Sequence, residues 1–503
     1  MHSEETTTQL DRLLARHRAA VDSAVERLGT PLHVLFLEVM RENAVGFLDV
    51  AHALYPNTVI AFAAKSNPCR GALRAAHHLG LGADVASEFE LRAALEESID
   101  PDRITCNGNA KSDAYIEAAL RAGALVAVDN TDELARLETL ADDAVSRPRI
   151  LLRFRGMPLS GLTSDDQTTA SDWTKFGFHI DDAPDLFGRI ASSRTVRFVG
   201  ISAHIGTQIA DPVGYERLIS QFVELAAAAA RAGLTIEAID IGGGFPVRFL
   251  PKDAWDRFTS RLLSRVQGES GVDQAVTWND VAMGYASTKS DRSVPPQWIG
   301  KSYWTPAPGS EMLAHLLRHR LPDGRTTVEW LGAVGSPRLI VEPGRSLLAT
   351  AGVTLTRAMG VKRVLGHSVV ALDLGINNHG TNLISPDIFP AAVLPKRDGD
   401  RPIEAFLAGR LCFSGDMISK AKVRLNRTPR RGEPFVLYHT GAYGADHFAS
   451  HSCGFPRPAK VAIRGDGTVE VWRAPESFED LFGLREASLL LDGLRDGGRR
   501  GSS

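Results

Sequence analysis

The sequence lacks the features that mark secreted, membrane-bound and nucleic-acid-binding proteins. It has only four cysteines in 503 residues, and no two of them form a CxxC metal or redox pair. No apolar run is long enough to cross a bilayer, and a net charge of -3 leaves no field of one sign for nucleic acid or a membrane surface. The polar, acidic start MHSEETTTQLDRLL does not resemble a secretory signal. We therefore expect a cytoplasmic globular protein with reduced thiols and neither a nucleic-acid nor a membrane partner.

Short apolar, β-prone runs alternate with amphipathic stretches through the first two thirds of the chain. One amphipathic stretch begins at Ser87 with Glu90 three residues later, which is the spacing of a helix capping box. Eight such alternations predict a closed (β/α)8 barrel of the TIM type rather than an open doubly wound sheet. The expected strands are 58–65, 81–87, 104–108, 124–130, 149–155, 197–206, 235–244 and 338–346.

The sequence pattern changes after residue 346, where β-prone runs become frequent and helical patterns become rare. Asp466-Gly467 is a strong hairpin signal within this part. An α/β barrel followed by an all-β domain of sandwich or Greek-key type is therefore the expected architecture. The expected parts are an N-terminal helix and strand that join the β domain (1–36), the barrel (37–348) with an insertion at about 270–330, the β domain (349–490) and a disordered tail (491–503).

Polar residues fall at the ends of the expected strands, where a barrel of this type carries its active site. Lys65 ends the run TVIAFAAK. A lysine there can extend its charge to water, or it can lose its proton in a desolvated pocket and attack a carbonyl. Polar strand ends throughout the barrel favour the second interpretation. They are Lys65, Asp84, Asn107, Asp129, Arg153, His204, Gly242–Gly244 and Glu342.

Pyridoxal phosphate is a carbonyl cofactor that such a lysine could hold, provided that a phosphate site and a partner for the pyridine nitrogen lie nearby. The segment DIGGGFP offers free backbone N–H groups, Arg345 offers a cation, and Glu342 could face the ring nitrogen. The nicotinamide fingerprint GxGxxG is absent. Taken singly, three glycines after a strand are common, His204 fits a core histidine, and Glu342 fits a turn cap.

Eight ordered motifs between about Thr30 and Ile463 resemble those of the diaminopimelate, ornithine and arginine decarboxylase family, which are pyridoxal-phosphate enzymes of the alanine-racemase-like barrel fold (fold type III). They are FAAKSNP, ADVAS, HIGTQ, DIGGGFP, VEPGRSLLATAG, LDLGINN, CFSGD and GAYGADHF…PRPAKV. The resemblance implies a lysine imine at Lys65, His204 stacked on the ring and Glu342 at the pyridine nitrogen. It also implies Asp84 supporting the lysine, Arg153 near the phenolic oxygen, and a phosphate site of Thr207, Gly242, Gly243, Gly244, Arg345 and Tyr443.

The resemblance further implies a head-to-tail homodimer with shared active sites, in which Cys412 and Tyr443 come from the partner subunit. Cys412 would return a proton to the substrate Cα after carbon dioxide leaves; without the motif, the same residue is typical of a small buried hydrophobe. The implied activity is decarboxylation of an amino acid. A pyridoxal-phosphate racemase or epimerase is an alternative. A relative that has lost its chemistry is disfavoured, because the lysine and the phosphate site remain.

Two departures from the family pattern concern the substrate. Phe413 follows the motif cysteine, where relatives that act on diamines or diaminopimelate usually carry an acid, and Ser385 stands where diaminopimelate decarboxylases carry an arginine. A buried ammonium without its partner costs roughly 3–5 kcal/mol. We therefore expect an amino acid other than diaminopimelate, free or tethered to a carrier, unless Asp416 or Asp387 replaces the missing acid. Asp373 is a further substrate-binding candidate, and a diaminopimelate decarboxylase proper is the alternative within the family.

The segment between Gly244 and Glu342 is long for this family and rich in aromatic residues. It fits a surface excursion with its own small core, and it also fits a lid that excludes water from the active site. Its aromatic residues include Trp278, Tyr285, Trp298, Tyr303 and Trp304.

Overall fold

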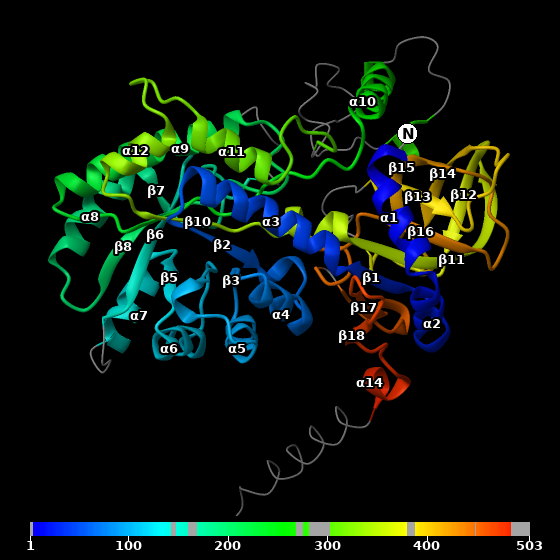
Figure 1. Cartoon of the computed structure of the whole chain (residues 1–503), viewed down its shortest axis with the longest axis horizontal. Coiled ribbons are helices and arrows are strands. Elements are labelled where there is room, and N and C mark those ends of the chain that lie inside the picture. The colour runs from blue at the N-terminus through cyan, green and yellow to red at the C-terminus, as the bar shows by residue number, and fades with distance from the viewer. Residues whose placement is uncertain are drawn as a thin grey trace, which may run out of the picture.

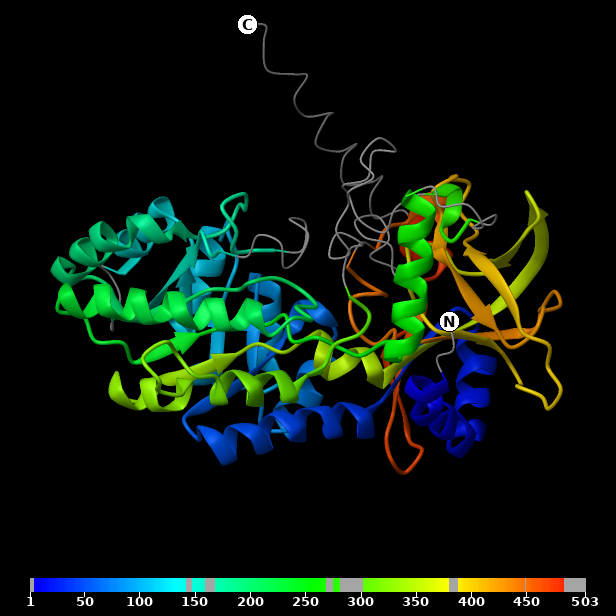
Figure 2. The same ribbon diagram turned by 90° about the horizontal axis from the view of Figure 1, so that it is seen from above.

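The computed structural model describes residues 4–141, 147–158, 168–267, 275–280, 302–379, 388–447 and 449–483. Figures 1 and 2 show a barrel ringed by helices beside a second body built on a β-sheet. The sequence predicts this combination of an eight-stranded barrel and a separate sheet, and the structure confirms it. Among the described helices, none has the length and apolar character needed to span a membrane.

Eight parallel strands close the barrel, because β10 pairs with β2 and β5 pairs with β6. Each strand lies within its expected range, and most end several residues earlier, since the last residues of each run turn into the loops at the barrel mouth. A ninth, two-residue strand, β7 (Phe178–His179), pairs in parallel with the end of β6. The barrel strands are β2 (Thr58–Ala63), β3 (Gly82–Val85), β4 (Ile104–Cys106), β5 (Leu125–Val128), β6 (Arg149–Arg155), β8 (Arg197–Ser202), β9 (Ala238–Asp240) and β10 (Arg338–Val341).

Amphipathic helices cover the outside of the barrel. At the start of α5, Ser87 accepts the backbone N–H of Glu90 at 3.2 Å, as the capping-box spacing predicts, but the Glu90 carboxylate accepts the N–H of Ala86 instead of that of Ser87. The helices from α3 to α13, of which α10 faces the second sheet, are α3 (Leu37–Leu54), α4 (Arg70–His78), α5 (Glu88–Glu96), α6 (Asp113–Ala122), α7 (Thr131–Ala141), α8 (Ala183–Ser192), α9 (Val213–Arg231), α10 (Lys252–Gln267), α11 (Ser310–Arg318), α12 (Thr327–Ala333) and α13 (Arg345–Leu348).

The second body is a mixed nine-stranded sheet. Its main path runs β15-β14-β12-β11-β1-β17-β18, and β16 pairs with both β11 and β13. The antiparallel hairpin β17–β18 turns at Asp466-Gly467, where Gly467 has φ +87° and Asp466 accepts the N–H of Thr468. The strands are β1 (Leu32–Phe36), β11 (Gly352–Val364), β12 (His367–Leu372), β13 (Ala391–Val393), β14 (Ile403–Ala408), β15 (Met417–Leu425), β16 (Pro434–Tyr438), β17 (Ala459–Ile463) and β18 (Val469–Arg473).

One cluster of buried apolar residues extends through the N-terminal segment and both bodies. Helices α1 (Glu4–Arg16) and α2 (Arg18–Leu28) precede β1, which lies between β11 and β17 in the second sheet. The main cluster of buried residues is continuous from Leu10 of α1 through Phe36 and Val461 to Val341 in the barrel. The barrel mouth is therefore held against the second sheet by packing as well as by chain connections.

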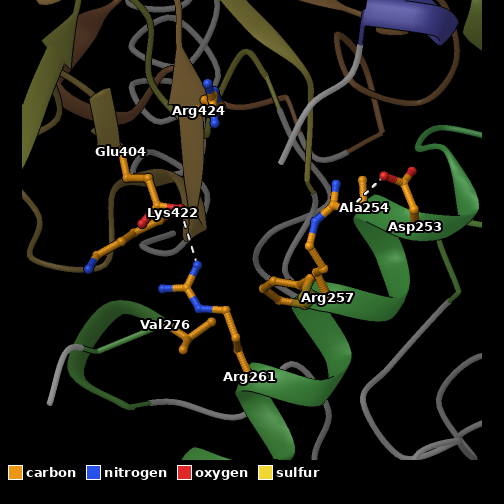
Figure 3. A pocket seen from close by; sticks show the side chains of 9 residues that line it. Asp253, Ala254, Arg257, Arg261, Val276, Glu404, Lys422 and Arg424 are labelled. Carbon is orange, nitrogen blue, oxygen red and sulfur yellow. Dashed lines mark hydrogen bonds and ion pairs between the residues drawn. The ribbon is translucent and has the colours of Figure 1, made fainter. Parts of the chain in front are cut away.

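Helix α10 faces the second sheet across a cleft of about 530 Å³ (Figure 3). Arg261 of α10 and Glu404 of β14 pair across this cleft at 3.1 Å. The start of the insertion is fastened to the same sheet, since Val276 accepts the N–H of Lys422 at 3.2 Å and the Trp278 ring packs edge-on against Phe406. The described ends of the insertion are thus packed into the fold.

Candidate active site

Lys65 lies at the mouth of the barrel, in a single 3-10 turn directly after β2 (η1, Ala64–Ser66). Its Nζ lies 2.5 Å from Oδ2 of Asp84, the third residue of β3. The Lys65 side chain is 35% exposed, whereas the Asp84 side chain is 1% exposed. Burial lowers the pKa of Lys65, but the charges of Asp84 and Glu342 outweigh this effect and raise the pKa above its ordinary value. The amine is thus held as an ammonium at the edge of a buried acidic site.

Asn67, which ends the lysine turn before Pro68, joins this turn to the second sheet. Asn67 is buried and donates to the carbonyl of Gly441 at 3.0 Å, while its own amide oxygen accepts Nζ of Lys460 at 2.6 Å. Lys460 lies on β17 of the second sheet. The turn that carries Lys65 is therefore anchored to the second sheet, which fixes the lysine against the barrel mouth.

Three buried carboxyl groups lie behind the lysine, namely Asp84, Asp240 and Glu342. Asn107 links two of them, because its Nδ2 donates to Asp84 at 2.8 Å and to Glu342 at 2.7 Å. Burial raises the pKa of Asp240 to about 7. Burial and the neighbouring Asp240 and Asp84 raise the pKa of Glu342 well above its usual range. A cationic group in contact with Glu342 would reverse this effect and favour its carboxylate form.

His204 follows β8 and meets the triple-glycine segment. Its Nδ1 accepts the backbone N–H of Gly243 at 2.8 Å. Burial, together with the positive charges of Lys65 and Arg153, lowers the pKa of His204 well below its ordinary value. The imidazole is therefore neutral with its proton on Nε2, since Nδ1 already acts as an acceptor.

The triple glycine permits a close approach that no side chain would allow. Gly242 and Gly244 have φ +66° and +89°, and a Cβ on Gly243 would lie 2.4 Å from the carbonyl oxygen of Glu342. The backbone N–H groups of this segment thus lie close to the mouth of the barrel, as the DIGGGFP motif predicts for a phosphate-binding loop.

Arg345 provides a buried cation beside this loop, at the start of α13. Its Nη2 donates to Thr207 at 3.1 Å, and its guanidinium carbon lies 4.7 Å from the centre of the Tyr443 ring. Its Nε is buried and has no hydrogen-bond partner among the described residues. Burial lowers the pKa of Arg345. A buried guanidinium with an unused donor is a site for an anion such as phosphate.

Arg153 lies near the end of β6 among buried groups. Its Nη1 lies 3.5 Å from Oδ1 of Asp129, and its guanidinium lies 4.2 Å from the centre of the Phe176 ring. Asp129 also belongs to the polar strand ends found in the sequence, and it orients this arginine. Asn107 and Asp129 are thus site residues whose roles the strand-end pattern alone could not assign.

Tyr443 reaches the site from the same chain, so its expected origin in the partner subunit is wrong. Its backbone N–H donates to the carbonyl of Ser66 at 2.7 Å, next to Lys65, and its ring faces Arg345 of the same chain. The physical reason is that the 440–446 segment follows β16 and is bound directly to the lysine turn. Sequence order alone did not reveal this contact between residues almost 400 positions apart.

Cys412 and Phe413 make no hydrogen bond or ion pair with Lys65 in the part of the chain that the structure describes. Both are exposed in the loop between β14 and β15, and Phe413 is 54% exposed. The expected partial burial of the Cys412 thiol is therefore not present in the single chain. Two further candidates, Ser385 and Asp387, lie outside the described residues, as do Tyr285 and Trp298 of the insertion.

The carboxylates of Asp416 and Asp373 already accept hydrogen bonds from neighbouring groups of the same chain. The two carboxylate oxygens of Asp416 accept the backbone N–H groups of Ile376 at 2.7 Å and Leu411 at 2.6 Å. Asp373 accepts from Thr30 at 2.6 Å and from the backbone of Arg357 at 2.9 Å. Asp416 thus binds two loop segments, and Asp373 binds Thr30 and strand β11, so every carboxylate oxygen of the two residues already accepts a hydrogen bond.

Similarity to known proteins indicates which cofactor this site binds. The family described as "Pyridoxal-dependent decarboxylase, pyridoxal binding domain" matches residues 47–270, the part of the barrel that carries the lysine turn, His204 and the triple glycine. The barrel of this chain carries the pyridoxal-binding domain of the pyridoxal-dependent decarboxylases. The protein is a pyridoxal-phosphate enzyme of fold type III and acts on an amino acid.

The similar proteins cover nearly the whole decarboxylase chain. A diaminopimelate decarboxylase from Actinosynnema pretiosum is 29% identical over 91% of this chain and 89% of its own. An uncharacterized protein, y4yA, from Sinorhizobium fredii is 28% identical over 90% and 92%. The crystal structure of a diaminopimelate decarboxylase from M. jannaschi superposes with a TM-score of 0.71 at 22% identity, covering 92% of this chain and 93% of the other.

The residues of the decarboxylase site fit pyridoxal phosphate. The unused Nε of Arg345 and the open backbone at Gly243 suit its phosphate, and the buried acid Glu342 suits a pyridine nitrogen. When bound, the cofactor draws electrons from the Cα of the amino acid and so weakens the bond to its carboxylate. Lys65 would supply the amine that the cofactor aldehyde requires.

Proposed function

We propose that this decarboxylase acts on an amino acid whose side chain lacks the distal ammonium and carboxylate of diaminopimelate. The observation that carries the proposal is Phe413, an aromatic residue at the position where relatives that act on diamino substrates usually carry an acid. Loss of that acid would leave a substrate ammonium unpaired, at a cost of roughly 3–5 kcal/mol. Such a cost corresponds to a loss of about a hundredfold to a few thousandfold in rate or affinity.

The acid that follows Phe413 in the same loop does not replace the missing one. Asp416 is three residues beyond Phe413, but both of its oxygens are used by the backbone N–H groups of Ile376 and Leu411. Freeing one oxygen for a substrate would leave a buried N–H without a partner, at a cost of about 1–3 kcal/mol. The Cys412–Phe413 loop therefore presents a thiol and an aromatic ring, which suits an apolar or aromatic substrate side chain.

The proposed roles are those that the family resemblance implies, and the geometry of the barrel mouth supports them. Lys65 would hold the cofactor aldehyde, with Asp84 orienting its amine. Arg345, Thr207, Tyr443 and the glycine loop would bind the phosphate, and Arg153 would lie near the phenolic oxygen. His204, neutral and buried, would cover one face of the ring, while Glu342 as a carboxylate would keep a proton on the ring nitrogen.

We further propose that the active enzyme is a homodimer with shared sites. Cys412 is exposed in the single chain. An acid that protonates Cα must lie close enough to pass it a proton directly or through one water. A two-fold partner would supply this group, so that the partner's Cys412 donates the proton after carbon dioxide has left. Phe413 would be buried by the same contact, which accounts for an aromatic side chain that is 54% exposed.

The similarity to proteins named diaminopimelate decarboxylase favours diaminopimelate as the second candidate substrate. A panel of amino acids that includes diaminopimelate, lysine and aromatic and aliphatic residues separates the two. The holoenzyme is incubated with each, and the amines and carbon dioxide are measured by mass spectrometry. We expect an apolar or aromatic amino acid to react fastest; diaminopimelate as the fastest substrate would overturn the proposal. Inversion at Cα without carbon dioxide would instead identify a racemase.

A matched pair of variants tests the role of Phe413. Phe413→Glu restores an acid, and we expect it to raise kcat/KM for diaminopimelate or lysine by at least about tenfold, since a single charge-assisted hydrogen bond is worth about 1.5–3 kcal/mol. Phe413→Leu keeps an apolar side chain and should leave these substrates poor. Equal effects of the two variants would show that this position does not select the substrate.

A further inference from the structure

Helices α9 and α11 lie side by side on the outside of the barrel (Figures 1 and 2). Glu216 lies in the first turn of α9, His315 in the last turn of α11, and His319 directly after α11. The two histidines are four residues apart, so they lie on one face of the helix end, one turn from each other. Neither residue is part of the decarboxylase site described above.

The three side chains converge on one carboxylate oxygen. Oε1 of Glu216 lies 2.8 Å from Nε2 of His315 and 3.5 Å from Nδ1 of His319. The three potential ligand atoms all lie within 4.8 Å of one another, and this is the only such group of three among the described residues. The side chains are 25%, 42% and 20% exposed for Glu216, His315 and His319, so an ion can reach them from solvent.

These separations suit a tetrahedral transition-metal ion. Zn²⁺ binds histidine nitrogen and carboxylate oxygen at about 2.0–2.2 Å, which places neighbouring ligand atoms roughly 3.3–3.6 Å apart. The separation of 3.5 Å between His319 and Glu216 lies within this range, and that of 2.8 Å between His315 and Glu216 is shorter, so small side-chain rotations would suffice. Two histidines and one carboxylate form a recurrent protein ligand set for zinc, with a fourth position left for water.

The backbone around the three residues is already fixed. Leu313 and Leu316 of α11 are buried in the core, and the carbonyl of His319 accepts the N–H of Thr327 at 2.9 Å. On α9, the residue before Glu216 is the fully buried Tyr215, which donates to the carbonyl of Gly243 at 3.0 Å. Little ordering entropy would oppose binding of an ion, because the two helices that carry the ligands are held in place.

We propose that Glu216, His315 and His319 form a surface site for a divalent transition metal such as Zn²⁺. The metal would join the start of α9 to the end of α11 and so stabilise the fold. Because Tyr215 contacts the glycine loop, the site would also fasten the helix behind that loop. The ion takes no part in decarboxylation, since the site lies on the outer helices of the barrel.

Isothermal titration of the metal-stripped holoenzyme with Zn²⁺ near neutral pH tests this site. We expect one ion per chain. His315→Asn and His319→Asn each remove a ligand, and Glu216→Gln keeps a hydrogen-bond acceptor for the histidines but removes the charge. Each should weaken binding by about tenfold or more, with an unchanged far-UV circular dichroism spectrum. His52→Asn, which changes an exposed histidine at the end of α3, is the matched control.

Thermal unfolding gives an independent measurement. An ion that binds only the folded state raises the unfolding temperature, so Zn²⁺ should raise it in the parent enzyme and in His52→Asn but not in the three site variants. No binding by the parent enzyme, or binding that all three variants retain, would overturn the proposal. In the second case the ion would bind elsewhere, and the three residues would form an ordinary surface ion pair.

Discussion

The short contact with Asp84 is the strongest interaction that favours the charged form of Lys65, and Glu342 adds to it. An amine attacks an aldehyde only after losing its proton, so a carboxylate that raises the pKa of Lys65 slows the capture of the cofactor while it orients the amine. The same carboxylate is held in place by Asn107, which also holds Glu342. The Asn107 amide thus links Asp84, which pairs with Lys65, to Glu342, which would face the ring nitrogen.

Asp84→Asn should make cofactor capture faster at neutral pH. The substitution removes the largest pKa-raising charge on Lys65, so the pKa falls and more of the amine is neutral at a given pH. The rate at which the apoenzyme gains visible absorbance with added pyridoxal phosphate should therefore rise with pH in both proteins, with the profile of the variant displaced to lower pH. Steady-state turnover should decrease, because the amine loses its orienting partner.

An identical pH profile in the variant would show that Asp84 does not control the proton on Lys65. Asp22→Asn, which changes an exposed acid on α2, serves as the control and should leave the profile unchanged.

At the scale of elements, the site depends on two loops. The barrel holds the glycine loop in place, and the second sheet helps to hold the lysine turn. The glycine loop after β9 packs so closely that a Cβ on Gly243 would overlap the backbone of Glu342. The lysine turn after β2 is bound to the 440–446 segment through Asn67 and Ser66. The lysine turn could not keep its position if the barrel and the second sheet moved apart, because its partners Gly441 and Tyr443 follow β16 of that sheet.

Gly243→Ala should weaken cofactor binding by at least about tenfold while the fold is retained. The added methyl group would displace either the N–H that His204 accepts or the carbonyl of Glu342, and both lie at the cofactor site. The affinity is measured by titrating the apoenzyme with pyridoxal phosphate. Gly188→Ala in α8 is the control: nothing lies within 4 Å of its added Cβ, and alanine favours a helix by about 1 kcal/mol. Equal affinities in the two variants would contradict the tight packing of the glycine loop.

Asp446 connects the segment that carries Tyr443 to β17 and β18. It pairs with Lys460 and Arg473, and Lys460 also donates to Asn67 beside the lysine turn. Burial alone raises the pKa of Asp446, but the two cations outweigh burial and lower it below the ordinary value. A group with a lowered folded-state pKa stabilises the fold above its unfolded pKa of about 4, and this contribution is lost as pH falls through the folded-state value.

Asp446→Asn should therefore destabilise the protein at neutral pH by about 3–5 kcal/mol, since it leaves Lys460 buried without a counter-charge. The difference between parent and variant should shrink as the pH is lowered below about 4. Denaturant unfolding at a series of pH values measures both effects. Asp22→Asn removes an exposed ion pair with Arg18 and should change stability little at any pH. A constant difference across the pH range would contradict the assigned pKa of Asp446.

At the scale of the whole molecule, one chain assembles most of the cofactor site but leaves Cys412 and Phe413 exposed to solvent. Everything that would hold the phosphate and the ring comes from the barrel and from the Tyr443 segment of the same chain. The proposed proton donor, Cys412, and the residue proposed to select the substrate, Phe413, lie on a different loop of the second sheet. A homodimer with shared sites is the arrangement that we propose to unite them.

Mixing two inactive variants tests the shared site. Lys65→Ala and Cys412→Ala dimers are unfolded and refolded together with the cofactor. Random pairing makes half of the dimers mixed, and each mixed dimer has one intact site of two, so about a quarter of the parent activity should return. If Cys412 acts on its own chain, or takes no part in the reaction, the mixture will regain no more activity than the separately refolded variants.

The sequence by itself determined the barrel, the family and most of the site. Strand ends follow from a local pattern of apolar runs, and in a parallel barrel all carboxyl ends meet at one mouth, so Lys65, Asp84, Asn107, His204 and Glu342 could be placed together without coordinates. The glycine motif likewise reports a local backbone requirement. The expected domain boundaries and the individual roles at the site stay predictions.

Only the tertiary structure decided which loops meet across the two bodies. It placed Tyr443 beside Lys65 of its own chain, and it showed that Asp416 and Asp373 bind neighbouring backbone and side-chain groups. It also brought Glu216 to His315 and His319. Such contacts join residues far apart in sequence, and they depend on the packing of whole elements rather than on any local pattern of hydrophobic and polar residues.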